Sequence, residues 1–167
     1  MGYADLPFNS FIDEPLNALS CLIPIFLIQK INVYTLMILI NLVIAFARHA
    51  DVSNYYYEYM DGVSLISPLL LYIWQNGSEY MMYGSMALGV VYVIPKKKAD
   101  PQFSLDSIIA AIMIILAVFI AYSKGIKMRI GLIILAMFVR QTKSVFSHAL
   151  WHLLAGWFFV RVAEQIG

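Results

Sequence analysis

The chain has 167 residues, of which 62% are hydrophobic and only 13% are charged, and its mean hydropathy is +0.78. This composition excludes an ordinary soluble domain and predicts an integral membrane protein that crosses the bilayer several times. The net charge of +1 combines 11 basic with 10 acidic residues, so a nucleic-acid partner is not indicated. Because Cys21 is the single cysteine, an intrachain disulfide is excluded.

Seven apolar runs follow one another along the chain, and each approaches the length of about 20 helical residues that spans a bilayer core. They cover about 11–29, 32–49, 61–75, 80–95, 105–123, 129–142 and 144–163. Short loops force neighbouring helices to be antiparallel, so we predict an all-α, seven-transmembrane-helix bundle that forms a single domain over 1–167. Because the fourth and sixth runs are short, six spans with a re-entrant segment is the alternative. The N-terminus has no basic region before an apolar run, so we expect no cleaved signal peptide.

The first run begins with polar side chains, namely Asp13, Glu14, Asn17 and Ser20. Charged and amide groups so close to hydrocarbon are costly unless they face the bundle or water, which makes them functional candidates. On a helix, Glu14, Asn17 and Cys21 share one face. The alternative for the two acids is helix capping, because carboxylates are favoured in a first helical turn.

The second run closes with His49, and Asp61 opens the third run after a tyrosine-rich loop at 55–59. Asp61 has two readings that can coexist. It is suited to cap its helix, and beside a metal it could orient a ligand or accept a proton from water. The tyrosines are typical of an aromatic belt at a membrane interface.

The last run contains His148 and His152, which lie four residues apart and so share one face of a helix. Together with His49 they are all the histidines of the chain. Imidazoles suit zinc, and a catalytic zinc takes three protein ligands and keeps one position open. The alternative is a pair of helical histidines that are hydrogen-bonded at a membrane boundary.

Whether an odd or an even number of spans precedes a residue decides which membrane face it reaches, and this parity predicts where these residues meet. With seven spans, the start of the first, the end of the second, and the starts of the third and seventh all reach one membrane face. Lysine and arginine divide almost evenly between the two sides, so charge does not decide the orientation. We expect the site on the face that carries the N-terminus, outside the cytoplasm, in a membrane that the sequence does not identify.

Four motifs, taken in order, resemble the alkaline ceramidase family. They are Glu14-Pro15-Leu16-Asn17-Ala18-Leu19-Ser20, His49, Asp61 about a dozen residues later, and His148-Ala149-Leu150-Trp151-His152. This family belongs to a superfamily of seven-helix membrane hydrolases that includes adiponectin and progestin receptor-like and Per1-like proteins. The resemblance covers the whole chain and is strongest to short microbial ceramidase-like members.

The resemblance implies that His49, His148 and His152 bind zinc and that Asp61 assists the attacking water. It also implies that Glu14 corresponds to a glutamate of a calcium site in some eukaryotic members. We therefore expect a zinc-dependent hydrolase of a lipid amide, with a membrane lipid such as ceramide as its partner.

Two features depart from the family pattern. The acidic cluster that would complete a calcium site is thin, since only Asp5, Asn9, Asp13 and Glu14 are available. The superfamily usually has a serine four residues before the second-run histidine, and this chain has Ala45 there. This second departure favours a first alternative, a non-catalytic zinc protein that binds lipid. A second alternative is an acyl-ester hydrolase acting on a glycerolipid or a GPI lipid, and a third is a transporter or structural bundle.

Overall fold

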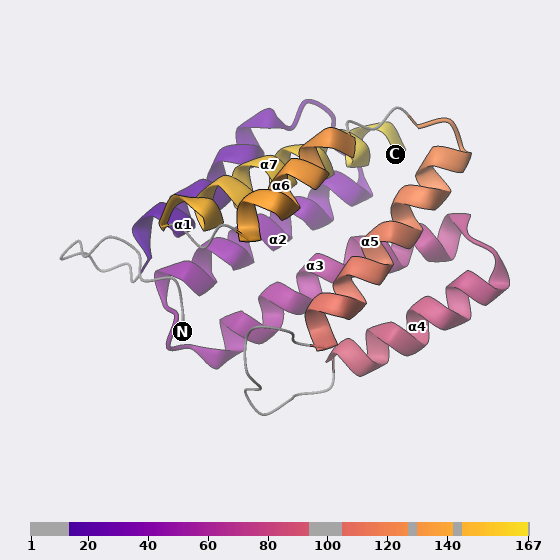
Figure 1. The fold of residues 1–167 in the computed structure, drawn as a ribbon, viewed down its shortest axis with the longest axis horizontal. Coiled ribbons are helices and arrows are strands. Elements are labelled where there is room, and N and C mark those ends of the chain that lie inside the picture. Colours follow the sequence, from indigo (N-terminus) through magenta and orange to yellow (C-terminus); the bar gives the residue numbers. More distant parts are fainter. Residues whose placement is uncertain (1–13, 94–104, 127–129, 142–144, 167) are drawn as a thin grey trace.

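The computed structural model describes residues 14–93, 105–126, 130–141 and 145–166. These residues form seven α-helices and one 3-10 helix, which confirms the prediction of an all-α chain with seven helices (Figure 1). The elements are α1 (Pro15–Leu22), η1 (Ile23–Leu27), α2 (Val33–Ala50), α3 (Tyr55–Asn76), α4 (Glu79–Val93), α5 (Leu105–Ser123), α6 (Ile130–Gln141) and α7 (Val145–Ile166).

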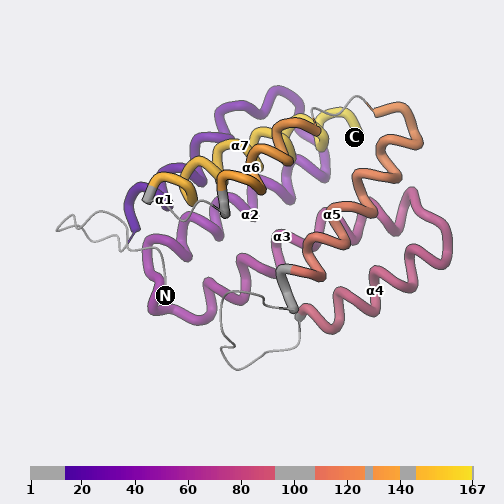
Figure 2. The backbone as a smooth tube through the Cα atoms, viewed as in Figure 1, coloured from indigo at the N-terminus to yellow at the C-terminus, as the bar shows by residue number. Residues whose placement is uncertain are grey.

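The helices form two groups that meet where α2 packs on α3. In the first group α1, α2 and α7 contact one another and α6 lies along α7, and in the second group α3, α4 and α5 pack together (Figure 2). The largest fully buried apolar side chains come from α3, α5 and α7, and they include Ile66, Ile73, Ile109, Met113 and Val160. This packing sets α2 and α7 antiparallel, so the last turn of α2 lies beside the first turns of α7.

The first apolar run is not one continuous helix. An eight-residue α1 passes into η1 at Ile23, and Pro24 stands at the start of that 3-10 segment. Proline has no N–H to donate and clashes with the preceding turn, which explains why the α-helix does not continue. Residues 11–13 of the predicted run, with Asp13, lie outside the described residues.

The third helix begins earlier than predicted. The side chain of Asn54 accepts a hydrogen bond from the backbone N–H of Tyr56 at 3.1 Å and so caps α3 at Tyr55. The tyrosine-rich segment that was predicted to be a loop is therefore the first turn of this helix. Asp61 lies in the second turn, so the interpretation of Asp61 as the helix cap is wrong.

The described helices differ in how well they suit a membrane. By length and composition, Val33–Ala50 is the one described helix that is long and apolar enough to cross a bilayer, and shorter apolar helices cover Pro15–Leu27, Ile108–Ser123 and Ile130–Val139. A single helix of this kind is also found in the cores of soluble proteins. The seven-span membrane bundle therefore stays a prediction.

The end of α7 is tied to the chain that links η1 and α2. The carboxylate of Glu164 accepts hydrogen bonds from the backbone N–H groups of Gln29 and Lys30, and it pairs with Arg161 at 2.8 Å. Asn32, which caps α2, also donates to the carbonyl of Ala163 at 2.8 Å. These contacts fix the position of α7 along the axis of α2. This axial offset determines which residues of the two helices meet at their other ends.

Candidate metal centre

His49 lies in the last turn of α2 and is 4% exposed. Its Nδ1 atom is 2.6 Å from Oε2 of Glu14, the residue that immediately precedes α1. The backbone N–H of Glu14 also donates to the carbonyl of His49 at 2.9 Å. Two hydrogen bonds thus join the start of α1 to the end of α2 and fix the orientation of this imidazole.

The contact with Glu14 decides which nitrogen of His49 presents a lone pair. We assign the proton of the neutral ring to Nδ1, because a carboxylate can only accept a hydrogen bond. The other nitrogen, Nε2, then presents its lone pair away from Glu14. A carboxylate that holds the far nitrogen of an imidazole is the usual arrangement around metal-bound histidines.

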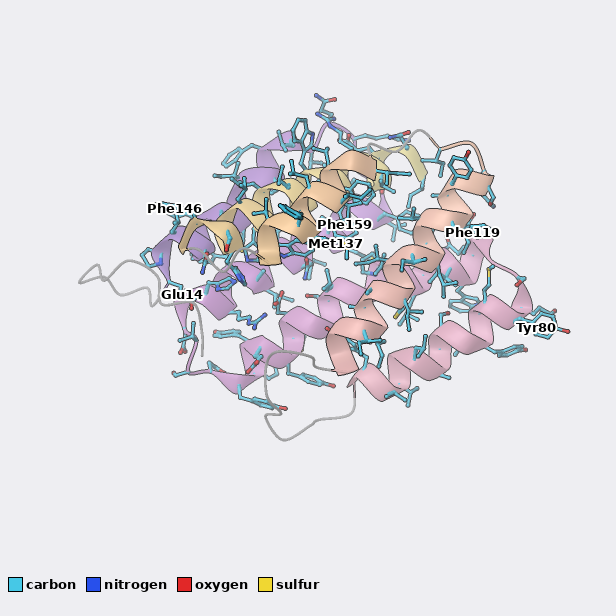
Figure 3. The ribbon with its side chains drawn as sticks, in the orientation of Figure 1. Glu14, Tyr80, Phe119, Met137, Phe146 and Phe159 are labelled. Carbon is cyan, nitrogen blue, oxygen red and sulfur yellow. The ribbon has the colours of Figure 1, made fainter. Side chains whose placement is uncertain are left out.

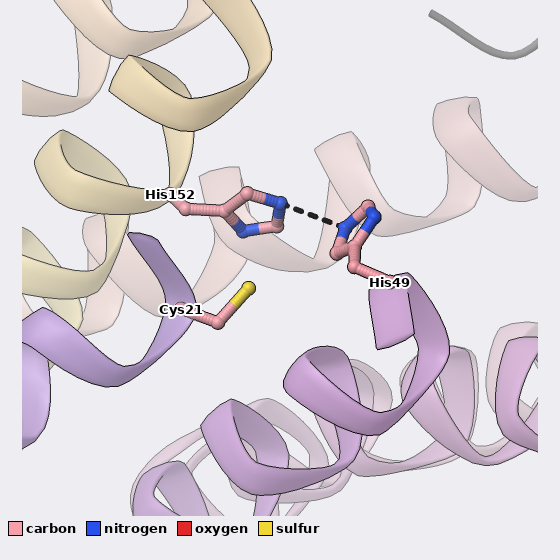
Figure 4. A group of neighbouring side chains, drawn as sticks. All are labelled: Cys21, His49 and His152. Atoms are coloured by element: carbon pink, nitrogen blue, oxygen red, sulfur yellow. Dashed lines mark hydrogen bonds between the residues drawn. The ribbon is translucent and has the colours of Figure 1, made fainter. Parts of the chain in front are cut away.

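His152 lies opposite this lone pair, with its Nε2 atom 3.0 Å from Nε2 of His49 (Figure 4). Two nitrogens bound to one tetrahedral zinc at about 2.0–2.1 Å are roughly 3.4 Å apart, so the observed pair differs by a few tenths of an ångström. The ring of His148, one turn earlier on α7, completes the cluster. Its centre is 5.0 Å from that of His49 and 4.7 Å from that of His152, while the centres of His49 and His152 are 5.0 Å apart.

The structure therefore brings together the three histidines that the sequence singled out. Three imidazoles around one tetrahedral ion have ring centres roughly 5 Å apart, which is close to this spacing. The donor atoms that all lie within 4.8 Å of one another, however, belong to Cys21, His49 and His152, and this group does not include His148. The parity argument placed the end of the second run and the start of the seventh at one face, and these are the helix ends that meet.

Cys21 also belongs to the cluster, although the sequence did not lead us to assign it there. Its sulfur, one ring nitrogen of His49 and one ring nitrogen of His152 all lie within 4.8 Å of one another (Figure 4), and its side chain is fully buried. The signal available in the sequence was weak, since Cys21 shares a helical face with Glu14. This buried Cys/His/His group could hold a metal ion, and its soft sulfur and imidazole donors are those that zinc prefers.

Asp61 lies near the cluster in an ion pair. Its Oδ2 atom is 2.7 Å from Nη1 of Arg48, while its Oδ1 atom is 3.4 Å from Nδ2 of Asn41. The carboxylate is 16% exposed and lines the same cavity as His148 and His152. Asp61 is thus available to a molecule in that cavity, although its strongest contact is with Arg48.

The cavity runs between α2, α3, α5 and α7 and has a polar end and an apolar body. The polar end contains Asn41, Arg48, Asp61, His148 and His152. The body is lined mainly by aliphatic and phenylalanine side chains. It ends at Tyr34, Tyr72 and Ile166, which lie toward the ends of α2, α3 and α7 that are remote from the polar end. The arrangement suits a molecule with one polar group and a long apolar tail.

Two further predicted positions can be placed. Ala45 is buried, one turn before His49, and it lines the cavity, so a serine hydroxyl there would face the cavity. Oε2 of Glu14 accepts from Asn17 at 3.1 Å and is held by His49, so Glu14 serves the histidine cluster. The other acids considered for calcium, Asp5 and Asp13, lie outside the described residues.

Comparisons with protein-family models, with curated protein sequences and with solved structures found no match to this chain.

Proposed function

We propose that the protein is a zinc-dependent hydrolase of a lipid amide, similar to alkaline ceramidases, which cleaves an N-acyl sphingolipid into a fatty acid and a sphingoid base. The observation that carries the proposal is the position of the histidine cluster at the polar end of a long apolar cavity. A scissile carbonyl at the cluster would leave an acyl chain in the apolar body.

Zinc bound in the cluster would lower the pKa of a water molecule toward about 7 and polarise the substrate carbonyl. Through its contact with Nδ1, Glu14 would keep the Nε2 lone pair of His49 directed at such an ion. Asp61 accepts the proton of the attacking water and returns it to the leaving amine. Arg48 holds Asp61 in place through their ion pair, and its remaining N–H groups can bind an oxygen of the lipid headgroup.

The length of the cavity supports one long acyl chain. Along α2 the lining extends from Arg48 to Tyr34, which is roughly 21 Å at 1.5 Å per residue. A cavity whose lining extends this far and whose body is apolar suits a long extended hydrocarbon chain. Long-chain N-acyl lipids are therefore the proposed substrates.

We also propose that the bundle lies in a membrane. Large apolar side chains point outward from α4 to α7, among them Tyr80, Phe119, Met137 and Phe146, which are 90%, 59%, 49% and 64% exposed (Figure 3). Extended apolar surface of this kind is rare on soluble monomers and is typical of surfaces that meet lipid or another protein. The proposal also follows from the apolar composition of the chain.

The direct test combines metal analysis with a lipid panel. Purified protein in nanodiscs should contain stoichiometric zinc and release fatty acid from N-acyl sphingolipids, with acyl-ester glycerolipids as the comparison. His49→Ala, His148→Ala and His152→Ala should each reduce bound zinc, whereas Trp74→Ala, at an exposed site on α3, should not. Full zinc occupancy in the His152→Ala protein would contradict the assignment.

A non-catalytic zinc protein that binds lipid is the second candidate, and the buried Ala45 favours it. If the chain is a hydrolase that lacks one donor, Ala45→Ser should raise turnover, since a single donor to a developing oxyanion contributes about 2.7–4 kcal/mol. If both the parent and the Ala45→Ser proteins hold zinc and cleave no lipid amide or ester, the second candidate replaces the first.

A further inference from the structure

We propose that Cys21 is a thiolate ligand of the same ion as His49 and His152, and that this thiolate regulates the centre. The proposal deepens the proposed function, because it concerns the same ion. It starts from the short mutual distances among the three donor atoms, all within 4.8 Å, and from the full burial of the cysteine.

The face of α1 that carries Cys21 also carries Glu14, since the two residues are seven apart, or about two helical turns. Both residues lie close to the imidazole of His49. Glu14 holds Nδ1, and the sulfur of Cys21 lies on the side of the cluster where His152 meets Nε2 (Figure 4). The helix that orients the imidazole therefore also brings a second donor to the same place.

The distances allow ligation after a small movement. In a tetrahedral site with zinc–sulfur at about 2.3 Å and zinc–nitrogen at about 2.0–2.1 Å, sulfur and nitrogen are roughly 3.6 Å apart. The distance from the sulfur of Cys21 to each of these imidazole nitrogens therefore has to shorten by at most about 1.2 Å. The set contains no carboxylate, which favours thiophilic ions over magnesium or calcium.

The proton balance is also satisfied. The thiol of Cys21 donates to the carbonyl of Asn17 at 3.2 Å, and binding the ion would release that thiol proton to solvent. The Asn17 carbonyl stays paired afterwards, because the hydroxyl of Ser20 donates to it at 2.7 Å. Ligation therefore leaves no buried carbonyl without a partner.

Ligation by Cys21 changes what the centre can do. With His49 and His152 it makes three protein donors. His148, whose ring centre is 4.7 Å from that of His152, would supply the fourth, and four donors fill a tetrahedral ion and leave no position for water. Structural zinc sites are closed in this way, whereas catalytic sites keep one position open. The thiolate would thus hold the ion in a closed form, and hydrolysis would require it to leave.

Cobalt(II) substitution tests the ligand directly, because a thiolate–cobalt bond absorbs strongly in the near ultraviolet and an imidazole–cobalt bond does not. The full chain in nanodiscs is titrated with cobalt beside Cys21→Ser, with Ser85→Ala as a control at a buried site in α4. We expect the band in the parent and control proteins and its loss in Cys21→Ser. The visible absorption of tetrahedral cobalt should persist in the Cys21→Ser protein. Identical spectra for the parent and Cys21→Ser, or no cobalt binding by either, would overturn the proposal.

A second measurement needs no substitution, since the chain has one cysteine. Alkylation by a small membrane-permeant maleimide should be much slower in zinc-loaded than in metal-free protein, and equal rates would overturn the proposal. The hydrolase assignment fails separately. If the parent shows the thiolate–cobalt band and neither the parent nor Cys21→Ser cleaves any lipid, Cys21 remains a ligand and the hydrolase assignment is rejected.

Discussion

The carboxylate of Glu14 lies 2.6 Å from Nδ1 of His49, and this contact joins two of the helix ends that form the candidate metal centre. It gives Glu14 a role in positioning an imidazole. The contact also offsets the cost of a charged residue at the start of an apolar run, where desolvation disfavours it.

Glu14→Gln should weaken zinc binding by about 10–100-fold, because the amide holds the Nδ1 proton less firmly than a carboxylate. The helix content should stay unchanged. Zinc affinity is measured by competition with a chelator. The matched control is Glu58→Gln, which removes an exposed carboxylate 4.0 Å from Arg48, and its affinity should equal that of the parent. Equal affinities in all three proteins would exclude the role of Glu14.

Asp61→Asn should reduce lipid hydrolysis by about 10²–10⁴-fold if Asp61 is the proton acceptor, with zinc content retained. Asparagine keeps the shape of the side chain and can still accept from Arg48. The contrasting variant is Asn54→Ala, which removes the true cap of α3 and should cost about 1 kcal/mol of stability without affecting the rate per folded molecule. Unchanged hydrolysis in Asp61→Asn would assign the residue to the ion pair alone.

Gly156→Ala should lower the melting temperature and the zinc occupancy together. An added Cβ would lie 2.5 Å from Cγ of Pro24, a ring that cannot rotate away, so α7 must shift from η1. Such overpacking costs about 1–3 kcal/mol. Gly84→Ala is the control, because nothing lies within 4 Å of its added Cβ, and alanine should stabilise that helix by about 0.5–1 kcal/mol. If the two variants melt alike, the contact with Pro24 is not tight.

Ala163→Leu should shift the preferred substrate to shorter acyl chains. Ala163 is 2% exposed and lines the end of the cavity remote from the histidines, so three added carbons would occupy space proposed for the chain terminus. The measurement is fatty acid release from a series of N-acyl chain lengths, with Ala163→Ser as a control of similar volume. An unchanged profile in Ala163→Leu would mean that the acyl chain does not reach this end.

Glu164 lies beyond the expected span 144–163. Its carboxylate should make the free energy of unfolding depend on pH. Burial raises the pKa of Glu164, but hydrogen bonds from the backbone N–H groups of Gln29 and Lys30 and the Arg161 guanidinium outweigh it and hold the pKa below its ordinary value. A lowered carboxyl pKa contributes stability at neutral pH, and the contribution is lost as the pH falls below about 4.3 and then through the folded-state pKa.

Glu164→Gln should therefore lower the melting temperature at pH 7 and have little effect near pH 3. The measurement is thermal unfolding across this range, compared with Glu79→Gln at the start of α4. A constant difference between the parent and Glu164→Gln at all pH values would show that the carboxylate charge is not responsible.

Much of the architecture could be predicted from the pattern of apolar runs. Seven runs separated by short breaks predict seven helices, and parity then brings the end of the second run and the start of the seventh to one place. The spacing of His148 and His152 sets both imidazoles on one helical face, which is a local property of a helix. The sequence could therefore predict a cluster of His49, His148 and His152.

Other features were decided only by the tertiary structure. The prediction placed Asp61 at a helix start, but the cap provided by Asn54 moved that start to Tyr55. The positions of Cys21 beside the imidazoles and of Arg48 beside Asp61 depend on how each helix is rotated about its axis. When a helix is apolar on most sides, its sequence does not specify which side faces a neighbour. That rotation is set by contacts between residues far apart in the chain, such as Gly156 against Pro24 and Glu164 against the link after η1.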